Sequence, residues 1–394
     1  IMTSSQTKSI ANPDSSTLKH LLEISDRSHY DIHYNVYFSN HLSHALVALH
    51  KLGATNERLE EFRQFYIKQL DPPKPKSKII TQDNWHEYLG KLHSYAELGD
   101  YFDDELKRLG SKERLLEEYL PKLVDGMSGD ATHGIINLGY AVHSPYEQSL
   151  TEALAYMVYS YVYLGHLEAH DESGVTDVIV HPYDGCNEFV QLLKYVNKDA
   201  LTMQQGMEQK CLEEPYCQLP GTVAKRLFII RDTQEYSLKL QQYVRQIKTI
   251  DKVKDEQLME LAHALSVAVL LAYEGTIPEP DNFFMLHGVT SCWAFRQTLK
   301  YFTNPKQLRS ALYSFVMTIV AVYLTQGIPE FILRDVNNES IPPWSAIIPL
   351  AVASDEEHLT KLVFNCYDDE QNYGQPIPNV YRSTAARKVG LLNW

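Results

Sequence analysis

Apolar residues recur with the spacing of an α-helix along most of this chain, and the alternation that marks a β-strand is almost absent. One example is the stripe formed by Leu42, Leu46 and Leu49. The best strand candidate is the β-branched run 176–180, which we expect to form a short irregular element. The pattern therefore predicts an all-α fold.

Proline-containing breakers separate the helical stretches, but no Gly/Ser block, low-complexity tract or repeat of fixed period divides the 394 residues. We therefore predict a single large multi-helix domain over residues 15–370, with a loop-rich excursion near 171–188. Residues 1–14 are expected to be disordered or extended. Residues 371–394 are expected to form a C-terminal extension that packs on the domain.

The charge balance argues against two classes of partner. Lys and Arg number 36 against 50 Asp and Glu residues, so the surface is acidic and repels phosphate backbones and anionic lipid head groups. The longest apolar run, 313–324, is shorter than the roughly 20 residues that span a bilayer, and we expect it to be a buried helix. Nucleic acid and membrane partners are therefore not expected.

The cysteines and the first residues bear on the compartment. Five cysteines, an odd number with no C-x-x-C pair, indicate a reducing environment. The first residues are polar and do not show the basic and then apolar pattern of a secretory signal. We therefore expect a cytoplasmic protein.

Signals for a tightly bound nucleotide are missing. No G-x-G-x-x-G follows a strand pattern, and no G-x-x-x-x-G-K-[ST] occurs. The hydrolase motifs G-x-S-x-G and H-E-x-x-H are also absent. A flavin or nicotinamide on a Rossmann unit is therefore disfavoured.

The histidines carry more information about chemistry. Of the sixteen, we interpret six as surface residues or hydrogen-bonded core residues, because their neighbours are polar or mixed: His20, His29, His33, His50, His86 and His93. Four other segments contain histidines in patterns that suggest a shared buried site.

Two of these segments lie in the first half of the chain. His41 and His44 are three residues apart, so on a helix both project from one face and can share a metal ion, or simply lie on a solvated surface. His133 aligns with Asn137 and Tyr140 along a polar stripe on an apolar helix. That stripe indicates either a metal ligand or a histidine that is hydrogen-bonded across helices.

The other two segments lie in the second half. His287 stands among apolar and aromatic residues, where an unpaired imidazole costs a few kcal/mol, so it needs either Ser291 or a metal as its partner. His358 and Lys361 lie one turn apart, which is also typical of a solvated helix face. If the Lys361 amine is buried beside a cation and neutral, it can add carbon dioxide and become an anionic carbamate.

Taken together, these segments resemble the questin oxidase-like family, from about residue 15 to about residue 368. The order and spacing of the similar blocks agree throughout. The blocks are 40–46 with 52–54, 101–106 with 118–121, 133–140 with 152–155, 284–291 and 355–361.

The resemblance implies oxidative cleavage of a ring in a phenolic, anthraquinone-type substrate by dioxygen. It also implies a non-haem Fe(II) ion that is bound by four histidines and a carboxylated lysine. The corresponding residues here are His41 or His44, His133, His287, His358 and Lys361. Five histidines for four places imply that one of them orients a ligand rather than binding the ion. The segment 168–188 does not resemble the fungal members, which leaves the substrate open.

Two other functions stay open. One is a Baeyer-Villiger-type monooxygenase that takes reducing equivalents from NADPH, as the older description of the family holds. It requires a dinucleotide site that the motifs do not reveal. The other is a non-catalytic helical binding protein that retains the fold. The sequence gives no prediction of the oligomeric state.

Overall fold

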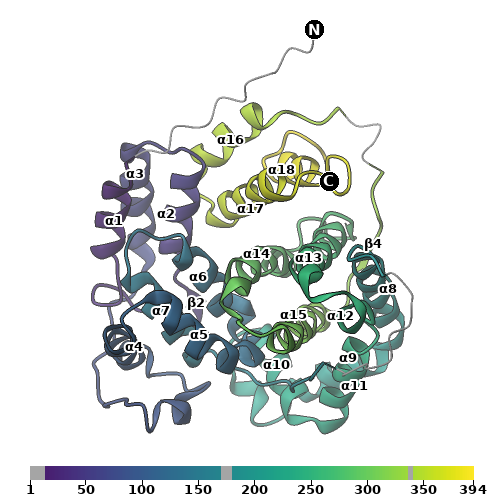
Figure 1. Ribbon diagram of the computed structural model, residues 1–394, viewed down its shortest axis with the longest axis horizontal. Helices are drawn as coiled ribbons and strands as arrows, with labels where there is room; N and C mark the ends of the chain where they lie inside the picture. Colours follow the sequence, from purple (N-terminus) through teal and green to yellow (C-terminus); the bar gives the residue numbers. More distant parts are fainter. Residues whose placement is uncertain (1–13, 170–179, 336–339) are drawn as a thin grey trace.

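The computed structural model describes residues 14–169, 180–335 and 340–394. Within these ranges the chain forms eighteen α-helices, and extended structure is confined to four strands of two residues each. The predicted all-α fold is confirmed. Figure 1 shows the helices packed around one another in a single body.

The first half of the chain forms seven α-helices. They are α1 (Ser15–Glu23), α2 (Leu42–Lys51), α3 (Asn56–Tyr66), α4 (Tyr95–Leu109), α5 (Lys112–Leu123), α6 (His133–Val142) and α7 (Gln148–Tyr159). Before α2, a hairpin pairs β1 (His33–Tyr34) with β2 (Phe38–Ser39) in antiparallel register.

The second half forms the other eleven. They are α8 (Asp184–Asp199), α9 (Leu201–Lys210), α10 (Thr222–Asp232), α11 (Gln234–Val244), α12 (Thr249–Lys252), α13 (Leu258–Glu274), α14 (Phe283–Thr298), α15 (Pro305–Thr325), α16 (Trp344–Ala353), α17 (Glu357–Tyr373) and α18 (Val380–Lys388). A second antiparallel pair joins β3 (Thr276–Ile277) to β4 (Glu330–Phe331).

The predicted excursion at 171–188 is only partly testable, because residues 171–179 and most of the strand candidate 176–180 lie outside the described residues. The prediction that the excursion continues to residue 188 is wrong. Helix α8 already begins at Asp184, and it buries Cys186, Phe189 and Leu193 at helical spacing. The turn that His181-Pro182 indicates is present, and the helix begins directly after it because its apolar face is buried.

Helix α14 lies at the centre of the fold and contacts α6, α13, α15 and α17 (Figure 1). Nearly all of its residues are buried, which fits a helix that is apolar on every side. Helix α2, near the start of the chain, lies beside α17, near its end. Helices from distant parts of the sequence therefore surround α14.

Helix α15 contains the long apolar run 313–324 and is buried as expected. In the described part of the chain it is the one helix that is long and apolar enough to cross a membrane by length and composition. Its most apolar window is 89% buried inside the protein, which is typical of a core helix.

Candidate metal centre

Five histidines that lie far apart in the sequence converge between α2, α6, α14 and α17. His41 and His44 stand at the start of α2, His133 begins α6, His287 lies in α14 and His358 lies in α17. The His41 ring centroid is 4.7 Å from that of His133 and 4.8 Å from that of His358. The His287 centroid is 4.8 Å and 5.1 Å from the same two rings. The structure thus brings together all five predicted histidines.

The convergence follows from where the four helices begin. His41 is the N-cap residue of α2, His133 is the first residue of α6, and His287 lies one turn into α14. In α17 the Glu356 side chain caps the helix by accepting from the backbone N–H of His358. Four helix N-termini therefore point their partial positive charges toward one place, which favours an anion there.

The hydrogen bonds of these rings occupy one nitrogen and leave the other free. His287 donates from Nδ1 to the Phe283 carbonyl at 2.7 Å, and His133 donates from Nδ1 to the Asp130 carbonyl. The Nδ1 atoms of His41 and His358 each lie 3.3 Å from Oε1 of Glu357. The carbonyl partners fix the proton on Nδ1 in His133 and His287, and the Glu357 carboxylate favours the same tautomer in His41 and His358, so that the Nε2 lone pairs are free.

All four of those Nε2 atoms are buried and have no hydrogen-bond partner among the residues that the structure describes. A buried polar atom without a partner costs about 1–3 kcal/mol, so four of them in one place call for a common partner. The ligand atoms of His41, His287 and His358 lie within 4.8 Å of one another. The donor set fits a metal ion that binds imidazole nitrogen.

His44 differs from the other four histidines. Within the described ranges, neither of its ring nitrogens has a hydrogen-bond partner. Its ring stacks on Tyr140, with centroids 5.5 Å apart and an interplanar angle of 11°. The Asn137 side chain lies close enough to oppose the lowering of the His44 pKa, but it does not form a hydrogen bond of good geometry, so the His44 ring is held less firmly than those of the other four.

Lys361 reaches the same centre and is fully buried, with 0% exposure. Its Nζ lies 3.4 Å from Nδ1 of His41, and no carboxylate of the described chain lies within 4.0 Å of it. Burial lowers the pKa of this amine to about 8, although the nearby Glu357 and Glu356 charges oppose the shift. A neutral amine is therefore accessible near physiological pH.

The imidazoles are neutral in this setting. Burial, with neighbouring positive charge as a further cause, holds the pKa well below its ordinary value for His41, His44, His287 and His358. Burial also lowers the pKa of His133 to about 4, against the opposing charge of Asp130. Neutral imidazole is the form that binds metals.

Comparison with known proteins decides the family. The sequence signature of the questin oxidase-like family matches residues 38–365, which cover most of the chain. The chain belongs to the questin oxidase-like family. The resemblance predicted from the sequence is thereby confirmed.

One curated relative of this questin oxidase-like chain is the Baeyer-Villiger oxidase mdpL of Emericella nidulans. The two are 24% identical over 302 residues, which make up 71% of this chain and 63% of the relative. The chain therefore spans less than two thirds of the length of that relative.

Three residues of the questin oxidase-like centre were missed by sequence reasoning. Glu357 was interpreted only as a helix N-terminal charge, and Asp130 was not singled out. Phe283 places its ring 4.6 Å from that of His287 and 4.8 Å from that of His358, and half of Phe283 is exposed. Phe283 lies one helical turn before His287, and this spacing could have indicated that the two side chains lie on the same face of the helix.

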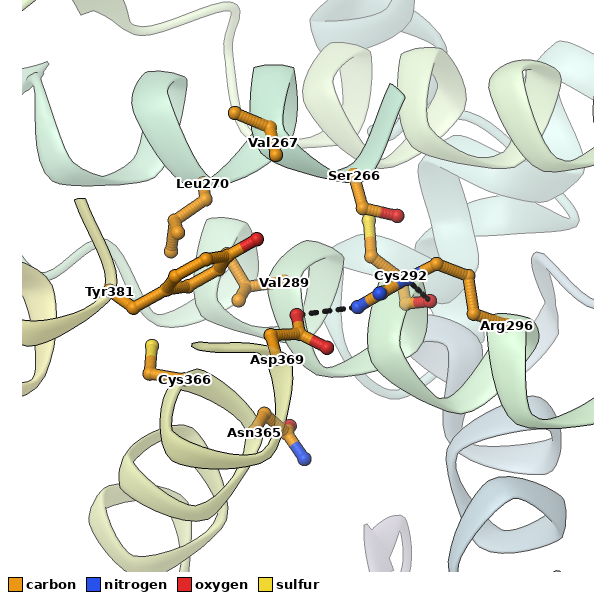
Figure 2. A pocket seen from close by; sticks show the side chains of 10 residues that line it. All are labelled: Ser266, Val267, Leu270, Val289, Cys292, Arg296, Asn365, Cys366, Asp369 and Tyr381. Carbon is orange, nitrogen blue, oxygen red and sulfur yellow. Dashed lines mark hydrogen bonds and ion pairs between the residues drawn. The ribbon is translucent and has the colours of Figure 1, made fainter. Parts of the chain in front are cut away.

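The buried polar face of α17 continues beyond the centre (Figure 2). Asn365 donates to the Tyr140 hydroxyl at 3.0 Å, and Asp369 forms a buried ion pair with Arg296 at 2.5 Å. Asn365, Asp369 and Arg296 line a cavity with about 10 Å³ of space, enough for one water molecule. Through Tyr140, this polar face supports the ring of His44.

Proposed function

We propose that the chain is a non-haem iron-dependent oxygenase that cleaves a carbon–carbon bond in the ring of a phenolic or quinone-type aromatic substrate. The observation that carries the proposal is the set of four buried, unpartnered Nε2 atoms on neighbouring rings. Ligand atoms of His41, His287 and His358 lie within 4.8 Å of one another, and the His133 ring lies 4.7 Å from that of His41 and 4.8 Å from that of His287. The family membership supports an oxidative reaction, and so does the similarity to the Baeyer-Villiger oxidase from Emericella nidulans.

The ligands that we propose are the Nε2 atoms of His41, His133, His287 and His358. Each of these rings has an oxygen atom at its Nδ1, which orients Nε2 toward the centre. His44 has no hydrogen bond of good geometry at either nitrogen among the described residues, and its ring stacks on Tyr140. We therefore propose that His44 is the one histidine of the five that does not bind the ion, and that its ring packs against that of His41.

Lys361 is the candidate for the anionic ligand. Four neutral imidazoles leave the double positive charge of Fe(II) uncompensated in a buried site, which is costly. The Lys361 nitrogen can bond to the carbon of carbon dioxide and release one N–H proton, which gives a carbamate anion. Full burial favours the neutral amine that reacts with carbon dioxide, and the nearby helix N-termini and the lack of a carboxylate within 4.0 Å in the described chain favour the resulting anion.

When bound, iron supplies the activation of dioxygen that an aromatic ring does not achieve by itself. The residues of the chain bind, orient and shield. The Glu357 carboxylate holds the Nδ1 proton of His41, and burial of the rings keeps bulk water away. The half-exposed ring of Phe283 offers an aromatic face to a planar substrate beside the ligands. The positive helix ends favour the phenolate form of that substrate.

A second candidate function is an NADPH-dependent Baeyer-Villiger-type monooxygenase, which the name of the relative favours. The strands in the described residues are two antiparallel pairs of two residues each, whereas a Rossmann unit needs a parallel sheet. NADPH would therefore have to bind in another way. The two functions differ in whether turnover requires a reductant.

The test combines metal analysis with turnover of a hydroxyanthraquinone. We expect purified protein to contain nearly one iron per chain, His287→Ala and Lys361→Ala to lose it, and the exposed control His86→Ala to retain it. Turnover with dioxygen alone supports the proposal, whereas turnover that requires NADPH in metal-free protein supports the second function. Iron content that is equal in all four proteins, or absent from all of them, would overturn the proposed centre.

The carbamate needs its own measurement. After exchange with ¹³C-bicarbonate, wild-type protein should show one carbamate resonance that Lys361→Ala lacks. The spectrum is recorded with Zn(II) in place of Fe(II), because paramagnetic iron would broaden the signal of a bound carbamate. A spectrum without that resonance in zinc-loaded wild-type protein rejects the carbamate and leaves the proposed histidine ligands unaffected.

A further inference from the structure

The turn that leads into His133 has an unfavourable backbone conformation. Asp130, Ala131 and Thr132 have φ angles of 49°, 51° and 69°, so three consecutive non-glycine residues occupy the left-handed region. L-residues adopt this region rarely and at a cost, and they keep it only where the surroundings impose it. Something must therefore hold this turn in place.

The Asp130 carboxylate is the main anchor. Its Oδ2 accepts from Nε2 of His33 at 2.7 Å, from the Ser39 hydroxyl at 3.3 Å and from the Tyr156 hydroxyl. These three donors come from β1, β2 and α7. Burial opposes ionisation of Asp130, but the bond from His33 and the positive charge of that ring hold the pKa of the carboxyl below its ordinary value. The anchor is thus a carboxylate with three donors.

The main chain of the same residue holds the candidate ligand. The Asp130 carbonyl accepts from Nδ1 of His133, which leaves the His133 Nε2 buried and unpartnered among the described residues. The donors Ser39 and His33 belong to the hairpin that runs directly into His41. One side chain therefore ties the segment before His133 to the segment before His41, and the rings of these two histidines stack at 4.7 Å.

The turn has no room to relax on its other side. A Cβ on Gly129 would lie 1.5 Å from the Ser160 carbonyl oxygen, and one on Gly134 would lie 3.1 Å from the Met157 backbone. The Ser128 hydroxyl also donates to the Val162 carbonyl at 3.1 Å. The turn is therefore held between the segment after α7 on one side and the hairpin on the other.

We propose that Asp130 is a positioning residue for the metal centre, and that its carboxylate, through His33, Tyr156 and Ser39, holds the strained turn in the one conformation that directs Nε2 of His133 toward the ion. This inference rests on the proposed function for the identity of the centre. It adds a residue that touches neither substrate nor metal and acts through His133.

The experiment compares Asp130→Asn with Asp125→Asn. The control replaces an aspartate of the same loop that bonds to His166 and Ser314, away from the centre. The first readout is the Co(II) dissociation constant of the metal-free protein, followed by visible absorption. The second is the ¹⁵N spectrum of histidine-labelled, metal-free protein, with the His133 signals identified through His133→Gln.

We expect Asp130→Asn to raise the Co(II) dissociation constant by about 10- to 100-fold and to convert His133 from one tautomer to a mixture, while Asp125→Asn matches wild type. An Asp130→Asn protein that equals the control in both readouts overturns the inference and leaves the proposed function intact. If wild type binds no cobalt, the proposed metal centre fails and the inference fails with it, an outcome distinct from the one in which wild type binds cobalt and Asp130→Asn equals the control. If Asp130→Asn does not fold, His33→Ala and Tyr156→Phe, which each remove one donor, take its place in both measurements.

Discussion

The imidazole ring of His41 lies nearly parallel to that of His133, at an interplanar angle of 23° and a centroid distance of 4.7 Å. One ring belongs to the N-cap of α2 and the other to the first residue of α6. Both have an oxygen atom at Nδ1 and no partner for Nε2 among the described residues. Two neutral imidazoles so arranged can bind one metal ion, and the stability of the protein should depend on whether that ion is bound.

Removal of the metal should lower thermal stability. An ion that binds only the folded state, at a free concentration about 100-fold above its dissociation constant, adds about 2.7 kcal/mol to the free energy of unfolding. A chelator should therefore lower the melting temperature by several degrees. Differential scanning calorimetry with and without chelator measures the shift. His287→Gln lacks one ligand, so the chelator should change its melting temperature little. Equal shifts in the wild type and in this variant would contradict the prediction.

Replacement of Phe283 should weaken the binding of an aromatic substrate. The ring is half exposed beside His287 and His358, so Phe283→Ala should raise KM about tenfold while iron content stays at the wild-type level. Phe283→Tyr keeps the aromatic face and should keep KM near the wild-type value. Steady-state kinetics with a hydroxyanthraquinone tests both variants, and a KM for the alanine variant that equals wild type counts against a substrate contact.

A methyl group at Gly129 should be far more damaging than one at Gly110. The Gly129 Cβ would meet the Ser160 carbonyl oxygen at 1.5 Å, so the backbone must move, at a cost of about 3 kcal/mol or more. Gly110 ends α4 with φ of 78°, but its Cβ would meet nothing within 4 Å. Gly110→Ala should therefore lose only about 1 kcal/mol, from left-handed strain. Urea unfolding of the two variants measures the contrast.

The stability of the protein should fall between about pH 4.5 and pH 8 because of Glu152. Burial is the main cause that raises the pKa of this carboxyl to about 7, against the opposing bond and charge of Arg27. The folded state therefore binds more protons than the unfolded state in this window. The contribution is complete below pH 4.5 and is lost as the pH rises through 7. Relative to wild type, Glu152→Gln should gain stability over this range in urea titrations, and parallel pH profiles would contradict the assignment.

Much of the fold and of the candidate site was accessible from the sequence, because helical periodicity and isolated polar residues on apolar helices leave a local signal. His133 and His287 stood out for that reason, and both lie in the cluster. The predicted excursion near 171–188 extends too far at its C-terminal end, because α8 begins at Asp184, directly after the turn, and buries an apolar face from Cys186 onward.

The hydrogen bonds around the ligands left no such signal. Glu357 lies in a run of acidic residues that suits any helix N-terminus, and its approach to His41 depends on α2 and α17 lying side by side. His33 was set aside as a surface or hydrogen-bonded core residue, and its bond to Asp130 joins segments that are distant in the sequence. The sequence also could not show which of His41 and His44 is the better candidate ligand, because this depends on the hydrogen bonds that each ring forms in the folded protein.

The pairing of α2 with α17 has a consequence for biosynthesis. His358 and Lys361 emerge from the ribosome only after most of the chain has been made, whereas His41 emerges early. A nascent or truncated polypeptide therefore lacks part of the donor set. On the proposed function, only molecules synthesised through Lys361 can retain the metal tightly, so metal content would separate complete folding from premature termination.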